Sequence, residues 1–351
     1  MSVGRKMAIG VVVAVMGVAV AAGCVEDTGE SGWVNADPPM ENIVIKSMHF
    51  EDENEGWMAT EGATGVGDRG VWYTDDAGQS WEQVHSEYNA YAVRPDAQGQ
   101  RVWLGGSDQR QLWYSDDGET FQPQADGFEQ GDTINHVYFW DDQVGLATTE
   151  TSDRLHRTED GGENFEQTEM QREVLSGTNG KDVDGDRVFL AAGTAFTGDE
   201  GGARILYSEN RAESWEIIEL VDQAHDFEGG PLEGIHVVDE TEIWAVGANR
   251  QMYYTRDGME SWQQVDGVHE DIRHFYDIDG YGDRLLAVGS TSTADDVFVF
   301  QSEDGGDSWR MMDFADGACG HGCNLRGVEF VHQDLAYAYG PNNTLLRLGS
   351  P

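Results

Sequence analysis

The chain has 351 residues, of which 66 are Asp or Glu and 21 are Lys or Arg, giving a formal net charge of −45 at pH 7. A surface this acidic repels phosphate groups, so it excludes nucleic acid as a natural partner and argues against docking on anionic lipid headgroups. The charge is spread along the chain and not gathered in a tail. Two interpretations fit this distribution: adaptation to a salty medium, or capture of a cationic partner.

The first 23 residues have the composition of a secretory signal peptide. Arg5 and Lys6 precede an uncharged apolar run, residues 7–20, which is too short to span a membrane comfortably. The sequence Ala-Ala-Gly-Cys then ends at Cys24 and resembles the lipobox of bacterial lipoproteins. That resemblance implies lipidation of Cys24, a linker over residues 24–30, and a place in the cell envelope, at the outer membrane of a two-membrane bacterium. An ordinary secretory signal with an incidental cysteine is the alternative.

One acidic turn occurs six times along the chain. The first copy is Thr-Asp-Asp-Ala-Gly-Gln-Ser-Trp, from Thr74 to Trp81, and successive copies are 40 to 50 residues apart. A period of this length is typical of a propeller blade with four strands. The aromatic residues that close the six turns are Trp81, Phe121, Phe165, Trp215, Trp262 and Trp309.

The residues before each turn predict three strands. In the first copy the strands are expected at 43–50, 56–60 and 71–74, and no segment has a sustained helical period. A seventh copy, residues 325–349, supplies three strands and no turn. Trp33 is placed like the turn-closing aromatics, so we expect an N-terminal strand to complete this last blade and close the ring. The predicted fold is all-β, a seven-bladed β-propeller over residues 31–351.

The turn pattern Ser/Thr-x-Asp-x-Gly-x-Ser/Thr-Trp/Phe resembles the Asp-box, or BNR repeat, of sialidases, sortilin-type propellers and some glycan hydrolases. The resemblance implies that the turns lie at the outer rim, away from an active centre. Physical chemistry predicts a structural role as well. An aspartate can accept N–H groups of its own turn, glycine adopts dihedral angles that other residues avoid, and the aromatic packs against the blade. We therefore expect a framework role, and not catalysis, for Asp76, Asp117, Asp160, Asp257 and Asp304.

Alignment of the blades predicts one polar position on most of the innermost strands. Such a ring near the channel mouth could bind a ligand or titrate near neutral pH. The alternative is that these residues pair with neighbouring blades or face water. The residues at this position are His49, Tyr138, Asp182, His236, Asp277 and Glu329.

Two further motifs are candidates for metal binding. Cys319 and Cys323 stand in Cys-Gly-His-Gly-Cys, and outside the cytoplasm such a pair is expected to form a disulfide. The alternative is a soft-metal site that uses both thiolates and His321. Residues 182–186, Asp-Val-Asp-Gly-Asp, are similar to part of a calcium loop, but they lack its glutamate at the twelfth position and are expected to form a hairpin turn. We predict neither a metal nor a cofactor.

The arrangement as a whole resembles the photosystem II stability/assembly factor family, which is WD40/YVTN/BNR-like. The shared features are the lipoprotein leader, the seven Asp-box blades and blade sequences of the type Gly-Trp…Gly…Thr-x-Asp-Gly-Gly-x-Ser-Trp. Members are non-enzymatic scaffolds that bind membrane-protein intermediates. The resemblance implies a monomer that binds an envelope or extracellular protein and contacts the membrane only through its lipid.

A carbohydrate-active enzyme, sialidase-like or glycoside hydrolase-like, or a glycan-binding propeller is the alternative function. A sialidase would need an arginine cluster and an Arg-Ile-Pro-like segment, and no such segment is present. The single Arg-Pro pair, Arg94-Pro95, is expected in a turn. The absence of a recognisable catalytic set favours binding, so we predict that the protein is not an enzyme.

Overall fold

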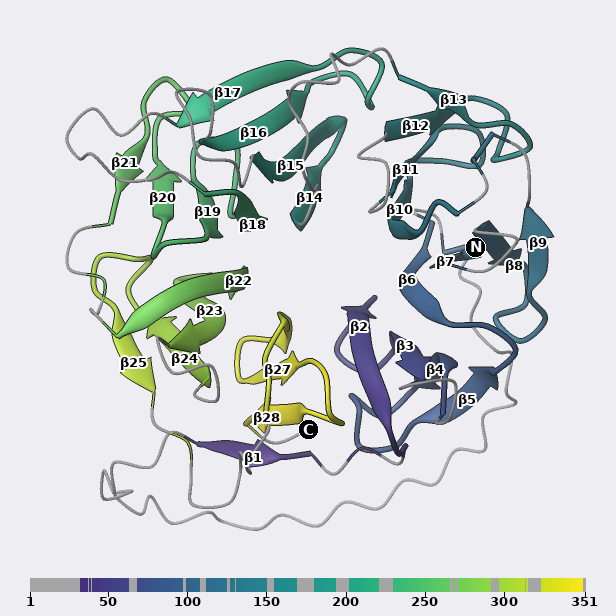
Figure 1. The fold of residues 1–351 in the computed structure, drawn as a ribbon, viewed down its shortest axis with the longest axis horizontal. Helices are drawn as coiled ribbons and strands as arrows, with labels where there is room; N and C mark the ends of the chain where they lie inside the picture. Colours follow the sequence, from purple (N-terminus) through teal and green to yellow (C-terminus); the bar gives the residue numbers. More distant parts are fainter. Residues whose placement is uncertain are drawn as a thin grey trace, which may run out of the picture.

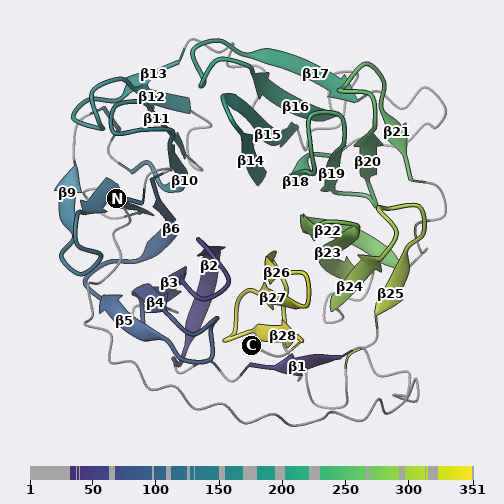
Figure 2. The ribbon, with the colours of Figure 1, turned by 180° about the vertical axis from the view of Figure 1, so that it is seen from behind.

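A computed structural model describes residues 32–349, apart from 37, 39, 63–67, 97–98, 108–111, 125–126, 130, 150–154, 169–179, 194–201, 221–229, 266–267, 269–270, 292–296, 313 and 315–322. The predicted signal peptide and linker lie outside this part. The described strands form seven four-stranded antiparallel sheets around a central opening (Figure 1). The view from behind shows the same ring, with β26 and β2 side by side at the opening (Figure 2). Within the described ranges no helix is long and apolar enough to cross a membrane.

Each sheet is one blade, and its strands run outward from the central opening in order. The innermost strands are β2 (Ile43–Phe50), β6 (Ala90–Pro95), β10 (Ile134–Phe139), β14 (Gly180–Asp184), β18 (Leu232–Val237), β22 (Ile272–Tyr281) and β26 (Gly327–His332). The second strands are β3 (Gly56–Gly62), β7 (Val102–Gly106), β11 (Gly145–Thr149), β15 (Arg187–Gly193), β19 (Ile243–Gly247), β23 (Arg284–Thr291) and β27 (Leu335–Tyr339). The third strands are β4 (Gly70–Thr74), β8 (Leu112–Ser115), β12 (Leu155–Thr158), β16 (Ala203–Ser208), β20 (Met252–Thr255), β24 (Val297–Ser302) and β28 (Leu345–Leu348). The outermost strands are β5 (Glu82–His85), β9 (Gln122–Gln124), β13 (Glu166–Gln167), β17 (Glu216–Leu220), β21 (Gln263–Gln264), β25 (Arg310–Met312) and β1 (Trp33–Asn35).

The hydrophobic core lies between the blades. Seven clusters of buried apolar side chains are present among the described residues, and each joins two neighbouring blades. A blade is therefore covered on both faces, which explains why its second strand is apolar without alternation: all five residues of β7 and of β19 are buried. Because no blade has a core of its own, its stability depends on its neighbours.

The seventh blade is made from both ends of the chain. β1 pairs antiparallel with β28, with Trp33 opposite Leu348. The indole of Trp33 is fully buried and packs with Leu286 and Val299 of the sixth blade. The predictions of an all-β, seven-bladed propeller and of closure by the N-terminal strand are confirmed.

The repeated turn joins the third and fourth strands of the first six blades. In the first copy the Thr74 hydroxyl donates to Asp76 Oδ1 (2.8 Å) and accepts the backbone N–H of Gly78 (2.9 Å). Asp76 in turn accepts the backbone N–H and the hydroxyl of Ser80 (2.8 and 2.6 Å). The hydroxyl and the carboxylate thus close the turn from within, as the sequence predicts for a structural residue.

These contacts keep the turn carboxylates ionised. The hydroxyl and backbone N–H of Ser308 hold the pKa of Asp304 at about 2, with a further contribution from the hydroxyl of Ser302. In the second copy, which is one residue shorter, the backbone N–H groups of Thr120 and Glu119 hold the pKa of Asp117 at about 2. A hydrogen bond to the charged form of a carboxyl group favours that form, so these groups are not poised to transfer protons near neutral pH.

Two copies lack the glycine of the pattern but keep its backbone geometry. Ala212 (φ 63°) and Met259 (φ 73°) stand where the sixth copy has Gly306 (φ 83°). Both donate their N–H to the turn's hydroxyl group, as Gly306 does. A non-glycine residue at positive φ carries a strain of about 1 kcal/mol, which the turn's hydrogen bonds offset.

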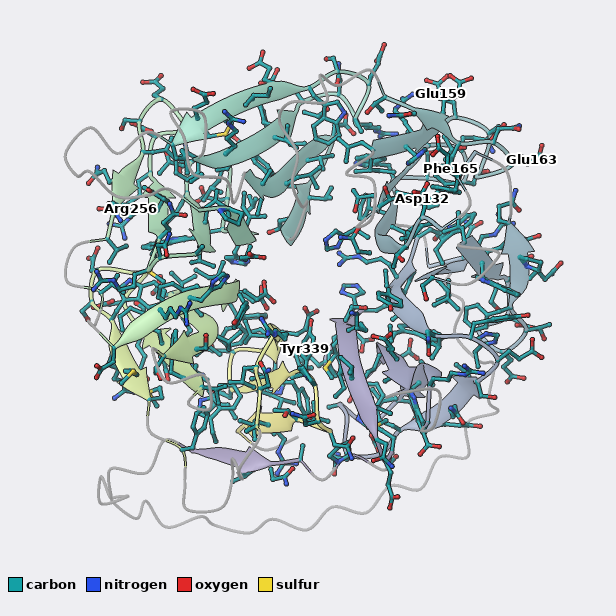
Figure 3. The ribbon with its side chains drawn as sticks, in the orientation of Figure 1. Asp132, Glu159, Glu163, Phe165, Arg256 and Tyr339 are labelled. Atoms are coloured by element: carbon teal, nitrogen blue, oxygen red, sulfur yellow. The ribbon has the colours of Figure 1, made fainter. Side chains whose placement is uncertain are left out.

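The turns point away from the central opening. Figure 3 shows Glu159 and Glu163 of the third turn, and Arg256 of the fifth, at the outer perimeter. The closing residue Phe165 points back between the blades, where its ring lies 6.2 Å from that of Phe139. This placement separates the turns from the channel, which is lined by the innermost strands.

Candidate functional site

The central channel contains a cavity of about 380 Å³ that is lined by residues from all seven innermost strands or the segments beside them. In the ribbon the inner strands converge on this opening, and Tyr339 of the last blade lies close to it (Figure 3). A cavity of this size is within the range of small-molecule sites. The channel is therefore the candidate functional site.

The strand register places one polar residue per blade at the same level of this channel. In the first blade Gly56 pairs with Thr74, the first residue of the turn, and the next residue, Trp57, pairs with His49 on β2. The same rule defines the equivalent position in every other turn-bearing blade, and Glu329, opposite Tyr337, holds it in the seventh. We call these residues the channel ring: His49, Arg94, Tyr138, Asp182, His236, Asp279 and Glu329.

The ring differs from the predicted one in two blades. Asp277 was expected in it, but Asp277 pairs with Val288 and lies at the next level, while Asp279 pairs with Leu286 and occupies the ring. Strand β22 continues past Ile278 to Tyr281, which pairs with Arg284, so the ring level falls two residues further along the chain than the sequence pattern indicates.

Arg94 is the member that the sequence analysis missed. It was expected in a turn, and this expectation was wrong, because both Arg94 and Pro95 belong to strand β6. Pro95 ends this strand, a position that proline tolerates. The sequence signal that could have placed Arg94 in a strand is the apolar run Tyr91–Val93 directly before it.

Carboxylates of the channel connect neighbouring inner strands. Asp182 on β14 accepts the backbone N–H of Val237 on β18 (2.7 Å). On the other side of the opening, Glu329 on β26 accepts the backbone N–H of Phe50 on β2 (3.3 Å). Because an inner strand has a free edge toward the channel, such bonds satisfy donors that the ladder leaves open.

The sixth blade makes two such connections to the seventh. Asp277 accepts the N–H of Val328 (3.0 Å), and Asp279 accepts the N–H of Phe330 (2.7 Å). Pairing with neighbouring blades was the alternative to a ligand-binding ring, and the structure shows that this pairing occurs. The pairing still leaves part of two carboxylates facing the cavity, since the side chains of Asp279 and Glu329 are 24% and 22% exposed.

His236 lies between two carboxylates of the ring. Its Nδ1 is 3.1 Å from Asp279 Oδ1 and 3.8 Å from Asp182 Oδ2. Burial alone would lower the pKa of His236, but the hydrogen bond to Asp279 and the charges of the acidic residues raise it above its ordinary value. On the opposite side, His49 Nδ1 is 3.3 Å from Glu329 Oε1. His236 thus links β18 to β14 and β22, and His49 links β2 to β26.

Three acidic residues of the channel resist ionisation. Burial raises the pKa of Asp277 to about 7, with the charge of Asp279 adding to the effect and the N–H of Val328 opposing it. Burial likewise raises the pKa of Glu329 well above its ordinary value, and the charge of Asp279 adds to this shift. Burial also raises the pKa of Asp182, against the opposing charge of His236. A cationic group in the cavity would favour the ionised forms, so the binding of such a group is coupled to proton release.

The remaining predicted residues lie apart from the cavity or outside the described part. Tyr138 occupies the ring level, but it does not line the cavity; its ring packs at 5.2 Å on Trp140. Cys24 and Cys319 lie outside the described residues. Cys323 is half-buried and disulfide-bonded, so it is not a thiolate ligand, and its pairing with Cys319 stays a prediction.

The three aspartates of residues 182–186 do not converge on one point. Asp182 faces the channel, whereas Asp184 pairs with Arg187 and Asp186 with Arg211. Among the described residues no group of three or more His, Cys, Asp or Glu side chains could hold a metal ion.

Fold and channel together define a closed seven-bladed β-propeller with a polar, mixed-charge channel. Solved structures with this fold include YCF48 bound to D1 peptide, with 17% sequence identity and a TM-score of 0.64 over 91% of this chain and 95% of that one. YCF48 from Cyanidioschyzon merolae has 16% identity and a TM-score of 0.65 over 90% of this chain and 98% of that one. An ancestral GH74 enzyme has 15% identity and a TM-score of 0.61 over 91% of this chain and 46% of that one. At these identities the likeness is one of fold, and fold alone does not fix function. No protein-family model and no curated protein sequence matches the chain.

Proposed function

We propose that this protein is a non-enzymatic, protein-binding propeller of the cell envelope that is attached to the membrane by a lipid on Cys24. The likeness to YCF48 bound to D1 peptide carries the proposal, because it extends over 91% of this chain and 95% of that one. A protein with a similar fold over almost its whole length thus binds a peptide. We assign the six turns to the Asp-box type on their internal hydrogen bonds.

The channel carboxylates support binding over hydrolysis. A glycosidase needs two carboxyl groups that flank the scissile bond, one of which is free to act as an acid. Here Asp182, Asp279 and Glu329 each accept a backbone N–H of the next blade, which fixes them as parts of the channel wall. Such groups are held in place for recognition by shape and charge.

Affinity purification of the lipidated, full-length protein from detergent-solubilised envelopes tests the proposal. The purification is repeated across a salt series, and the bound proteins are identified by mass spectrometry. We expect reproducible enrichment of one envelope protein or complex. Loss of that partner with rising salt would show that the acidic surface makes the contact, because salt screens exposed charges. Absence of any protein partner at every salt concentration would contradict the proposal.

The lipid anchor has its own test. Cys24→Ser should abolish incorporation of a labelled fatty acid and move the protein from the membrane to the soluble fraction. Cys323→Ser is the matched control, because it removes a cysteine that is disulfide-bonded in the structure and not one of the leader. Membrane association that survives Cys24→Ser would contradict the anchor.

A glycoside hydrolase is the second candidate, and one observation favours it. Asp277 lines the channel with a pKa of about 7, a value suited to a general acid at neutral pH, and a GH74 enzyme shares the fold. The same purified protein is therefore incubated with a panel of polysaccharides. If the wild type releases reducing ends and Asp277→Asn does not, the protein would be a glycoside hydrolase and not a scaffold.

A further inference from the structure

The positive side chains and the carboxylates of the channel come mostly from different blades. Lys46, Arg94 and His136 line the cavity from the first three blades, while His236 and Arg326 line it from the fifth and seventh. Carboxylates line it from the fourth, sixth and seventh blades; they are Asp182, Asp277, Asp279 and Glu329. In a closed ring of seven blades, the second blade faces the fifth and sixth across the opening. Arg94 therefore lies across the cavity from the sixth blade, which carries Asp277 and Asp279.

The guanidinium of Arg94 has no ion-pair partner among the described residues. It lies over the ring of Tyr138, whose centroid is 5.6 Å away, and its charge also acts on Glu329. Arg326, which precedes β26 in the seventh blade, lies over the ring of Tyr276, at 3.8 Å. By contrast, arginines outside the channel form ion pairs, as Arg101 does with Asp116 (2.8 Å) and Arg310 with Glu303 (3.0 Å). In a chain with 66 carboxylates, the guanidinium of Arg94, across the cavity from Asp277 and Asp279, is left available to an anion.

A hydroxyl group on the same wall is also unsatisfied. The buried Oγ of Ser47 has no hydrogen-bond partner in the described part of the chain, and Ser47 lines the cavity next to Lys46. A buried hydroxyl without a partner is unfavourable, and a polar ligand group would satisfy it. This side of the channel therefore offers the hydroxyl of Ser47 and the guanidinium of Arg94 to an acceptor.

We propose that the channel binds a small zwitterionic molecule, with its carboxylate on Arg94 and its cationic group on Asp277 and Asp279. A ligand with one charge would leave the opposite side unmatched, whereas a zwitterion satisfies both sides without changing the net charge of the cavity. The volume of about 380 Å³ accommodates a molecule from amino-acid to short-peptide size together with water. This inference is independent of the protein partner proposed above.

Calorimetric titration of the full-length, detergent-solubilised protein tests the inference with matched probes. The series of ω-amino carboxylates from glycine to 8-aminooctanoate varies the distance between the two charges. Hexanoate and hexylamine carry one charge each and control for 6-aminohexanoate. We expect saturable binding with an optimum at one chain length, and single-charge analogues that bind at least about tenfold more weakly, since each charge-assisted contact contributes about 1.5–3 kcal/mol. Binding of no zwitterion, or equal binding of hexanoate, would overturn the proposal.

Variants distinguish the channel from other surfaces. Arg94→Gln should weaken binding of the best probe by about tenfold or more, and Asp277→Asn should weaken it as well. Arg94→Lys keeps the charge and should retain most of the affinity, which guards against a loss that is due to misfolding. Arg310→Gln changes an exposed arginine of the outermost strand and should leave binding unchanged. Undiminished binding by Arg94→Gln, with a wild-type melting temperature, would place the ligand elsewhere and refute the assignment.

Discussion

Asp277 is the residue for which the structure makes the sharpest prediction about stability. Its pKa is raised from 3.8 to about 7, mainly by burial. A carboxyl group whose pKa is higher in the folded state than in the unfolded state contributes its full stabilisation at pH values below the unfolded pKa. This contribution is lost as the pH rises from the unfolded to the folded pKa. The shift of about 3 units corresponds to about 4 kcal/mol, at 1.36 kcal/mol per unit, and this cost is complete above pH 7.

Asp277→Asn removes the ionisation but keeps one oxygen acceptor. The carboxylate accepts the N–H groups of Ile278 and Val328, so asparagine should lose one of these bonds, at a cost of about 1 kcal/mol. At pH 8 the variant should be about 3 kcal/mol more stable than the wild type. At pH 5, where the folded carboxyl is protonated, the two proteins should agree within about 1 kcal/mol.

Urea unfolding followed by tryptophan fluorescence, at fixed salt and at several pH values from 5 to 8, measures this difference. Asp304→Asn is the control, because the pKa of Asp304 is held at about 2 and the group is ionised throughout this range. Its effect on stability should therefore not vary with pH. If the difference between Asp277→Asn and the wild type were equally flat, the assignment of a raised pKa to this carboxyl would be wrong.

Three further changes probe the frame of the propeller. Trp33→Ala should lower the free energy of unfolding by about 3–5 kcal/mol in urea titrations, since the indole that closes the ring is fully buried; a loss below about 1 kcal/mol would show that closure does not depend on β1. Thr74→Ala should cost about 1–2 kcal/mol because the hydroxyl ties the first turn, whereas Thr74→Ser should remain near the wild type, and equal losses would contradict this role. Gly306→Ala should lower the melting temperature more than Gly305→Ala, because a Cβ at Gly306 would lie 2.1 Å from Trp244 and one at Gly305 meets nothing within 4 Å; equal melting temperatures would contradict the contact.

The architecture could be predicted from the sequence because each blade is local in the chain. Strands that are adjacent in sequence are adjacent in the sheet, so the turn pattern and its period of 40 to 50 residues already count the blades. The short seventh copy and Trp33 were sufficient to predict that the two ends of the chain meet. The structural role of the turn aspartates followed from their side-chain chemistry, which acts within a few residues.

The channel depended on information that the sequence pattern does not contain. Strand β22 continues to Tyr281 before its hairpin, and this length places Asp279 instead of Asp277 at the ring level. The pairing of Asp182 with Val237, or of Glu329 with Phe50, joins residues from different blades. Sequence alone therefore determined the blades, their number and their closure, through local hydrogen bonding and a repeated period. Only the closed ring decided which charges face each other across the channel, because that distance is set by how seven separate sheets pack around one axis.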